Sequence, residues 1–183
     1  HWTFLVATLA IAGVPGLAGF FSKDEILWQA WSSPHGGSPI LWGIGALGAG
    51  LTAFYMFRLV FLTFYGTCRA DHATQHHLHE SPRSMTLPLV VLAVLAIVGG
   101  WIGIPQALGG GNQFERFLAP VFESAAPAGI GASEAAHGAI TAAHGHDPLE
   151  YVLMAVSVGI ALAGIALAHR MYIADPALPG RLT

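Results

Sequence analysis

The sequence has little charge. Only 9% of its 183 residues are Asp, Glu, Lys or Arg, against about a quarter in typical soluble domains, whereas 54% are hydrophobic. Seven Lys and Arg residues against ten Asp and Glu residues cannot form the basic face that nucleic-acid binding requires. Cys68 is the single cysteine, which excludes a disulfide scaffold. The sequence contains no GxxxxGK[ST] motif and no GxGxxG motif after a strand, so a nucleotide-binding enzyme is poorly supported. These absences leave a membrane protein.

Long uncharged stretches predict the fold class. They cover residues 2–22, 26–57, 84–114 and 151–168, and about 20 apolar helical residues cross a bilayer core of about 30 Å. None alternates with the period of two that a membrane β-barrel requires. We therefore predict an all-α membrane protein with four transmembrane spans. The expected spans are 1–31, 40–65, 85–107 and 149–172, with a long outer loop rich in Ala, Gly and His over 108–148 and a truncated tail over 173–183.

The few basic residues predict the orientation. Arg69 and Arg83 lie in the loop between the second and third spans, and Arg170 and Arg181 lie at the C-terminus. The first loop has no Lys or Arg, and the long loop has only Arg116. By the positive-inside rule, the loop between the second and third spans and the C-terminus lie in the cytoplasm.

Small residues at every fourth position predict close packing against a neighbouring helix, either within this chain or from another subunit. Such ridges let helices approach each other closely in lipid, although they are also expected from a chain rich in Ala and Gly. The two ridges are Gly45, Ala49 and Ala53 in the second span, and Ala155, Gly159 and Ala163 in the fourth.

The first span contains a predicted helix break. Thirty residues in one helix would measure about 45 Å, which exceeds the bilayer core. Pro15 lacks an N–H and clashes with the preceding turn, and the flanking Gly13 and Gly16 adopt irregular torsions easily. We expect half-helices over about 2–13 and 16–31. A break at this depth needs protein or a hydrated cavity around it, so it indicates an ion pathway.

Three charged residues, Lys23, Asp24 and Glu25, follow the break. Each of the first two costs about 2.5–3.5 kcal/mol at the bilayer centre. Burial disfavours the charged form of a lysine and a nearby carboxylate favours it, which is what a switchable proton site requires. Alternatively, residues 2–21 form an ordinary span, Lys23 lies at the interface, and Trp28 and Trp31 belong to the aromatic belt.

Other polar residues are weaker candidates. Arg58 either extends toward the cytoplasmic face or pairs with an internal carboxylate. Glu25 is either interfacial or a further intramembrane polar group. The loop histidines lack the fixed scaffold and Cys partners of a closed zinc site, so no metal site is expected. They are His76, His77, His79, His144 and His146.

Several motifs resemble one protein family. The stretch from Gly19 to Leu27 reads GFFSKDEIL, and further similarity runs through YMFR at 55–58, FLTFYG at 61–66 and HESP at 79–82. Together they resemble subunit L of proton-pumping NADH–quinone oxidoreductase, respiratory complex I. Sister subunits of multisubunit cation/proton antiporters and of membrane hydrogenases share much of this pattern.

The resemblance implies a fragment of a larger antiporter-like helix bundle in a bacterial inner membrane. It places the first span as the discontinuous helix of the C-terminal half, with Lys23 at the end of the intramembrane proton path and Asp24 as the acid beside it. The family's earlier glutamate–lysine pair, its central lysine and its lateral helix are absent from this sequence. The implied partners are lipid, protons and other membrane subunits. No cofactor is expected in this chain, since NADH, flavin, iron–sulfur clusters and quinone would lie in partner subunits.

Three functions therefore stay open. The first is a proton-translocating subunit whose buried lysine responds to quinone reduction elsewhere in the complex. The second is a subunit of a cation/proton antiporter or membrane hydrogenase. The third is a non-conducting structural element, and a histidine-based metal transporter is a distant fourth.

Overall fold

The computed structural model describes residues 1–33, 36–66, 71, 81–104, 108, 117–118 and 148–175. Every regular element in these ranges is helical, which confirms the predicted all-α class. The α-helices are α1 (Trp2–Ala12), α2 (Ala18–Ser32), α3 (Pro39–Phe64), α5 (Arg83–Val98) and α8 (Pro148–His169). A 3₁₀ helix, η1 (Gly99–Gly103), continues α5, and a π-helical turn, η3 (Arg170–Ala174), continues α8.

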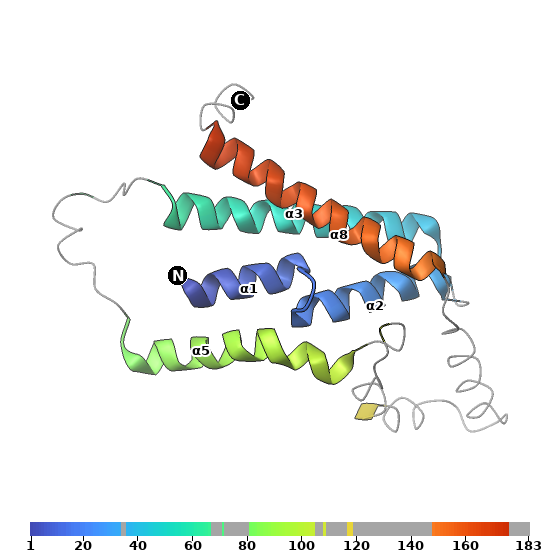
Figure 1. Cartoon of the computed structure of the whole chain (residues 1–183), viewed down its shortest axis with the longest axis horizontal. Coiled ribbons are helices and arrows are strands. Elements are labelled where there is room, and N and C mark those ends of the chain that lie inside the picture. Colours follow the sequence, from blue (N-terminus) through green and yellow to red (C-terminus); the bar gives the residue numbers. More distant parts are fainter. Residues whose placement is uncertain are drawn as a thin grey trace.

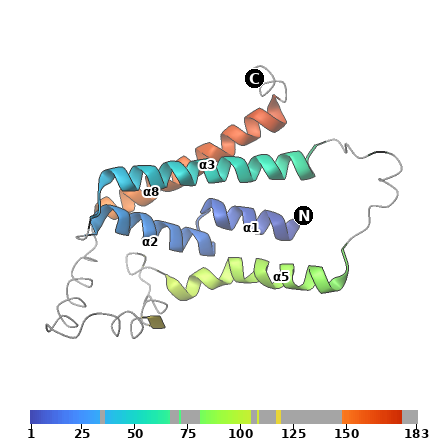
Figure 2. The same ribbon diagram turned by 180° about the vertical axis from the view of Figure 1, so that it is seen from behind.

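The helices lie side by side with the interrupted one in the middle. Helices α1 and α2 follow each other end to end, with α3 along one side and α5 along the other, as Figures 1 and 2 show from opposite directions. Helix α8 packs on α3 and crosses it (Figure 1). The C-terminal end of α2 and the N-terminal ends of α3 and α8 lie at the same end of the bundle (Figures 1 and 2).

Three helical stretches are long and apolar enough to cross a membrane: Pro39–Phe64, Arg83–Gly103 and Pro148–Ala174. Helix α1 is apolar but has only 11 residues, and with α2 it forms the predicted discontinuous helix. Helix α5 has no buried residue, and most of its Leu, Val and Ile side chains are exposed in this chain. Such a surface fits contact with lipid or with another apolar helix.

The core consists mainly of small residues between α3 and α8, together with the end of α1. Its buried cluster contains Ala12, Ala53, Phe57, Ala161 and Ala168. A Cβ atom added at Gly164 would lie 2.5 Å from the backbone oxygen of Gly50, so the two helix backbones approach each other closely.

The ridge predicted on α8 does not pack within this chain. Ala155, Gly159 and Ala163 are exposed in this chain, whereas the face of α8 toward the core carries Ser157, Ala161 and Ala168. Helix α8 has small residues on several faces, so their spacing could not identify the packed one. On α3, Ala49 and Ala53 of the predicted ridge are buried.

Some predicted segments lie outside the described residues. These are the loop histidines, nearly all of the outer loop 108–148, and the tail beyond Asp175.

Candidate functional site

The break between α1 and α2 begins with a Schellman motif. Gly13 is left-handed, with φ of 81°, and its N–H donates to the oxygen of Ala10 over 3.0 Å. The N–H of Val14 donates to the oxygen of Leu9 over 3.1 Å, which completes the motif. The motif leaves the carbonyl of Ala12, the last residue of α1, available to another donor.

Lys23 supplies that donor. Its Nζ donates a hydrogen bond of 2.7 Å to the Ala12 oxygen, so the half-buried side chain reaches back from α2 to the end of α1. A helix C-terminus carries about half a negative charge, which stabilises a cation placed there. A Cβ atom at Gly13 would collide with Lys23 Nζ and would lie 2.5 Å from its Cε. Gly13 therefore serves both the left-handed cap and the lysine that packs on it.

The other half of the break is stabilised by a residue that is distant in the sequence. Pro15 and Gly16 are exposed, and Gly16 has φ of 90°. The indole Nε1 of Trp101, in η1, donates to the Gly16 oxygen over 3.1 Å. Helix α2 then begins at Ala18 without a side-chain cap. The break is thus stabilised by Lys23 on one side and by Trp101 on the other.

Asp24 faces α8 rather than α1. It is only 7% exposed, and its Oδ1 accepts a hydrogen bond of 2.6 Å from Ser157 Oγ. The same Oγ lies 3.0 Å from the backbone oxygen of Met154. A hydroxyl has one proton and can donate to only one of these acceptors at a time. Ser157 can therefore donate to an ionised Asp24, or accept from a protonated Asp24 while donating to Met154.

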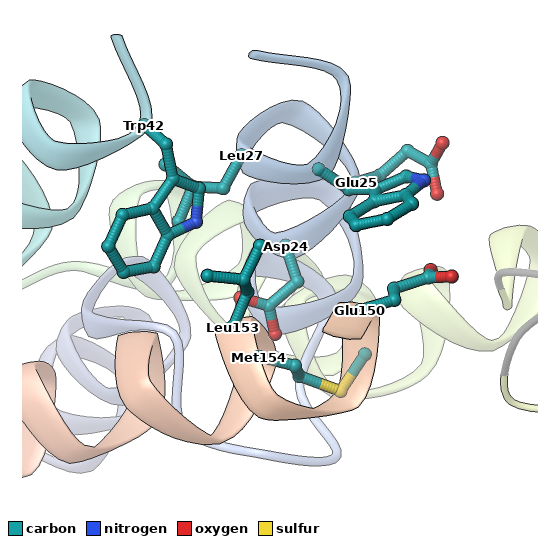
Figure 3. A pocket seen from close by; sticks show the side chains of 8 residues that line it. Asp24, Glu25, Leu27, Trp42, Glu150, Leu153 and Met154 are labelled. Atoms are coloured by element: carbon teal, nitrogen blue, oxygen red, sulfur yellow. The ribbon is translucent and has the colours of Figure 1, made fainter. Parts of the chain in front are cut away.

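The second oxygen of Asp24, Oδ2, is buried and has no hydrogen-bond partner in the part of the chain that the structure describes. Asp24 also lines a small cavity of about 10 Å³, close to the minimum that holds one water molecule. Figure 3 shows this pocket with Asp24 directed toward α8, and with Glu25 and Glu150 also at its edge. The lining residues are Asp24, Glu25, Leu27, Trp28, Trp42, Glu150, Leu153 and Met154.

The remaining candidates have simpler surroundings. Glu25 is partly exposed and accepts a hydrogen bond of 3.2 Å from Gln29 Nε2. Arg58 is exposed, and its guanidinium carbon lies 5.5 Å from the ring centroid of Tyr172, a cation–π contact. Within the described part of the chain, no group of three or more His, Cys, Asp and Glu side chains could hold a metal ion.

Lys23 and Asp24 are adjacent in the sequence but make different hydrogen bonds. Lys23 and Asp24 find their hydrogen-bond partners on different helices, α1 and α8. Sequence reasoning missed Ser157 and the buried Glu150. A signal was present: Ser157 is a polar residue within the uncharged run of the fourth span, and Glu150 lies seven residues earlier, on the same helix face.

The sequence of this chain is similar to those of known membrane proteins. Residues 1–52 match the model of the family described as NADH:quinone oxidoreductase/Mrp antiporter, TM. The NAD(P)H-quinone oxidoreductase chain 5 of Picosynechococcus sp. is 42% identical over 98% of this chain and 27% of its own length. Subunit 5 of the chloroplastic NAD(P)H-quinone oxidoreductase of Mesostigma viride is 38% identical over 94% of this chain and 24% of its own length.

A relative that carries the name of the predicted subunit is also similar. The NADH-quinone oxidoreductase subunit L of Mycobacterium tuberculosis is 37% identical over 93% of this chain and 23% of its own length. The chain thus spans about a quarter of the length of these relatives, and the resemblance drawn from its motifs is confirmed. This chain is therefore homologous, over nearly its whole length, to one part of the proteins named NADH-quinone oxidoreductase subunit L and NAD(P)H-quinone oxidoreductase chain 5.

Proposed function

We propose that this chain is part of a proton-translocating membrane subunit of an NADH–quinone oxidoreductase, and that Lys23 is a proton-carrying group in it. The observation that carries the proposal is the hydrogen bond from Lys23 Nζ to the Ala12 carbonyl at the helix break. It places a titratable amine at the end of a half-helix, and the only other Asp, Glu, Lys or Arg residues within 2–57 are the adjacent Asp24 and Glu25.

The surroundings of Lys23 suit a group that changes its charge. The carbonyl end of α1 stabilises the ammonium, while partial burial among apolar helices opposes it. A neutral amine still has N–H groups and can keep a hydrogen bond to the Ala12 oxygen. Both forms therefore have a place in the same geometry, and a modest change in the field around the break would shift the balance between them.

Asp24 and Ser157 extend this two-state behaviour to α8. The Ser157 hydroxyl has an acceptor in either protonation state of Asp24, because it can turn between Asp24 Oδ1 and the Met154 carbonyl. In the proposal, Lys23 and Asp24 load and release the proton, Gly13, Pro15 and Gly16 shape the break, and Arg58 and Glu25 are not proton carriers.

The redox chemistry belongs to other subunits. NADH, flavin, iron–sulfur clusters and quinone would be bound there, and this chain would respond to quinone reduction through conformation and electrostatics. We place the subunit in a bacterial inner membrane, with the loop between α3 and α5 on the cytoplasmic side. The end of the bundle that contains the C-terminus of α2 and the N-terminus of α8 then faces outward.

A second candidate function is cation/proton antiport. It is favoured by one observation, the match of residues 1–52 to a family whose description includes Mrp antiporters. The relatives at 37–42% identity over most of the chain are instead named quinone oxidoreductase subunits, so quinone-coupled translocation is the better supported of the two.

The driving force distinguishes these functions. Sealed membrane vesicles that contain the assembled complex are first given NADH and a quinone, and then, separately, a sodium or potassium gradient without NADH. A quinone-coupled translocase moves protons to the periplasmic side of the membrane, which is the lumen of inside-out vesicles, only when NADH is oxidised. Proton movement driven by the cation gradient alone would contradict the proposal and favour the antiporter.

A further inference from the structure

Glu150 is a buried acid that the proposed function does not yet use. It lies in the first turn of α8 and is only 6% exposed. Seven residues separate it from Ser157, which places both on one face of the helix and their Cα atoms about 10 Å apart along the axis. Ser157 is the residue that donates to Asp24. Glu150 therefore lies on the face of α8 that packs on Asp24, about two turns closer than Ser157 to the N-terminal end of α8.

The two acids lie at the same cavity. Asp24 and Glu150 both line it, together with Met154, one helical turn from Glu150 (Figure 3). Asp24 Oδ2 is buried and has no hydrogen-bond partner among the described residues, so this oxygen is the one on which Asp24 can carry a proton while Oδ1 keeps its contact with Ser157. A cavity of about 10 Å³ holds at most about one water molecule, which is enough to pass a proton without an open channel.

We propose that Glu150 is the next proton carrier after Asp24, on the way from the helix break to the end of the bundle where α8 begins. This inference rests on the proposed function, because it takes for granted that a proton reaches Asp24. The arrangement of the helices gives the direction of proton movement. The break lies in the middle of the bundle, and α8 begins at the end where α2 terminates (Figure 1).

The transfer step balances with the groups present. A protonated Asp24 gives its proton to a water molecule in the cavity, and that water gives a different proton to the Glu150 carboxylate. Asp24 returns to the carboxylate and regains the hydrogen bond from Ser157, the water is unchanged, and Glu150 becomes the neutral acid. Glu150 then releases its proton at the end of the bundle. No oxidant, metal or other reactant is needed.

A structural role for Glu150 makes a different prediction. An acid in the first turn of a helix stabilises the helix dipole, and that role needs no proton transfer. Substitution of a structural acid would change assembly or thermal stability but not the number of protons moved per electron.

The test uses the complete enzyme in sealed vesicles and measures protons moved per electron for four variants. Lys23→Met sets the loss expected when the proposed proton path is interrupted. Glu150→Gln removes the titratable group at nearly constant size, and we expect the same loss as for Lys23→Met. Glu150→Asp keeps a carboxyl group and should retain part of the pumping. Asp175→Asn changes an exposed acid at the other end of the same helical segment and should match the parent.

Each outcome decides the matter. Loss in Lys23→Met with full pumping in Glu150→Gln overturns the inference and leaves the proposed function standing, whereas full pumping in both overturns the two together. If Glu150→Gln does not assemble, infrared difference spectra of the parent and Glu150→Asp during turnover decide. The inference requires a carboxyl band that appears with turnover and shifts in Glu150→Asp, and identical bands in the two proteins overturn it.

Discussion

Two glycines in the helix break allow the contact of Lys23 to be tested without touching the lysine. Gly13 and Gly16 both have positive φ, at 81° and 90°. A Cβ atom at Gly13 would collide with Lys23 Nζ, whereas a Cβ atom at Gly16 would meet no heavy atom of the described residues within 4 Å. Gly13→Ala and Gly16→Ala therefore share the backbone cost and differ in their effect on Lys23.

The magnitudes follow from this difference. A left-handed alanine costs roughly 1–2 kcal/mol, and this applies to both variants. Gly13→Ala in addition displaces Lys23 from the Ala12 oxygen, and a hydrogen bond to a charged group contributes about 1.5–3 kcal/mol. A loss of that size changes the population of the docked lysine by roughly 10- to 150-fold.

Thermal unfolding and proton pumping of the assembled complex separate the two contributions. We expect both variants to lower the unfolding temperature, and only Gly13→Ala to lower the number of protons moved per electron. Equal pumping in the two variants, or a larger loss in Gly16→Ala, would refute the argument that the position of Lys23 determines proton movement.

Three stability predictions concern the rest of the bundle, each measured as thermal unfolding of the purified complex. Trp101→Phe removes the hydrogen bond that reaches the break from η1 and should cost about 1 kcal/mol, so an unchanged unfolding temperature would contradict this role. Thr8 is fully buried and its hydroxyl has no hydrogen-bond partner among the described residues, so Thr8→Val should stabilise by about 1 kcal/mol, and a loss of stability would show that the hydroxyl is hydrogen-bonded. Gly164→Leu should destabilise by about 1–3 kcal/mol or more, because the backbone of α3 lies against Gly164. A Cβ atom at Gly159 would meet no heavy atom of the described residues within 4 Å, so Gly159→Leu should be close to neutral. Equal effects of the two substitutions would contradict the observed packing of α8 on α3.

The fold class and the helix break could be predicted because both depend on local features. The length of the uncharged runs predicts spanning helices, and Pro15 between two glycines predicts an interruption. The half-helices expected over about 2–13 and 16–31 are Trp2–Ala12 and Ala18–Ser32 in the structure. The packed face of α8 could not be predicted in this way, because small residues occur on more than one of its faces.

The charged residues of the site could be predicted from the local sequence, whereas their hydrogen-bond partners could not. Lys23 and Asp24 were identifiable because a charged side chain in an apolar span costs free energy, which indicates a functional role. The acceptor of Lys23 is a backbone carbonyl, which has no side-chain signature, and Ser157 lies 133 residues from Asp24 in the sequence. Only the three-dimensional arrangement brings Ser157 and Glu150 to the Asp24 site.

Direct replacement of the lysine tests the central claim. The measurement compares protons moved per electron in sealed vesicles for the parent complex and for Lys23→Met, which keeps an unbranched side chain of similar length but removes the titratable amine. The proposed function predicts that pumping falls while quinone reduction and assembly continue. Unchanged pumping in an assembled Lys23→Met complex would show that Lys23 carries no proton, and the account of this site would be wrong.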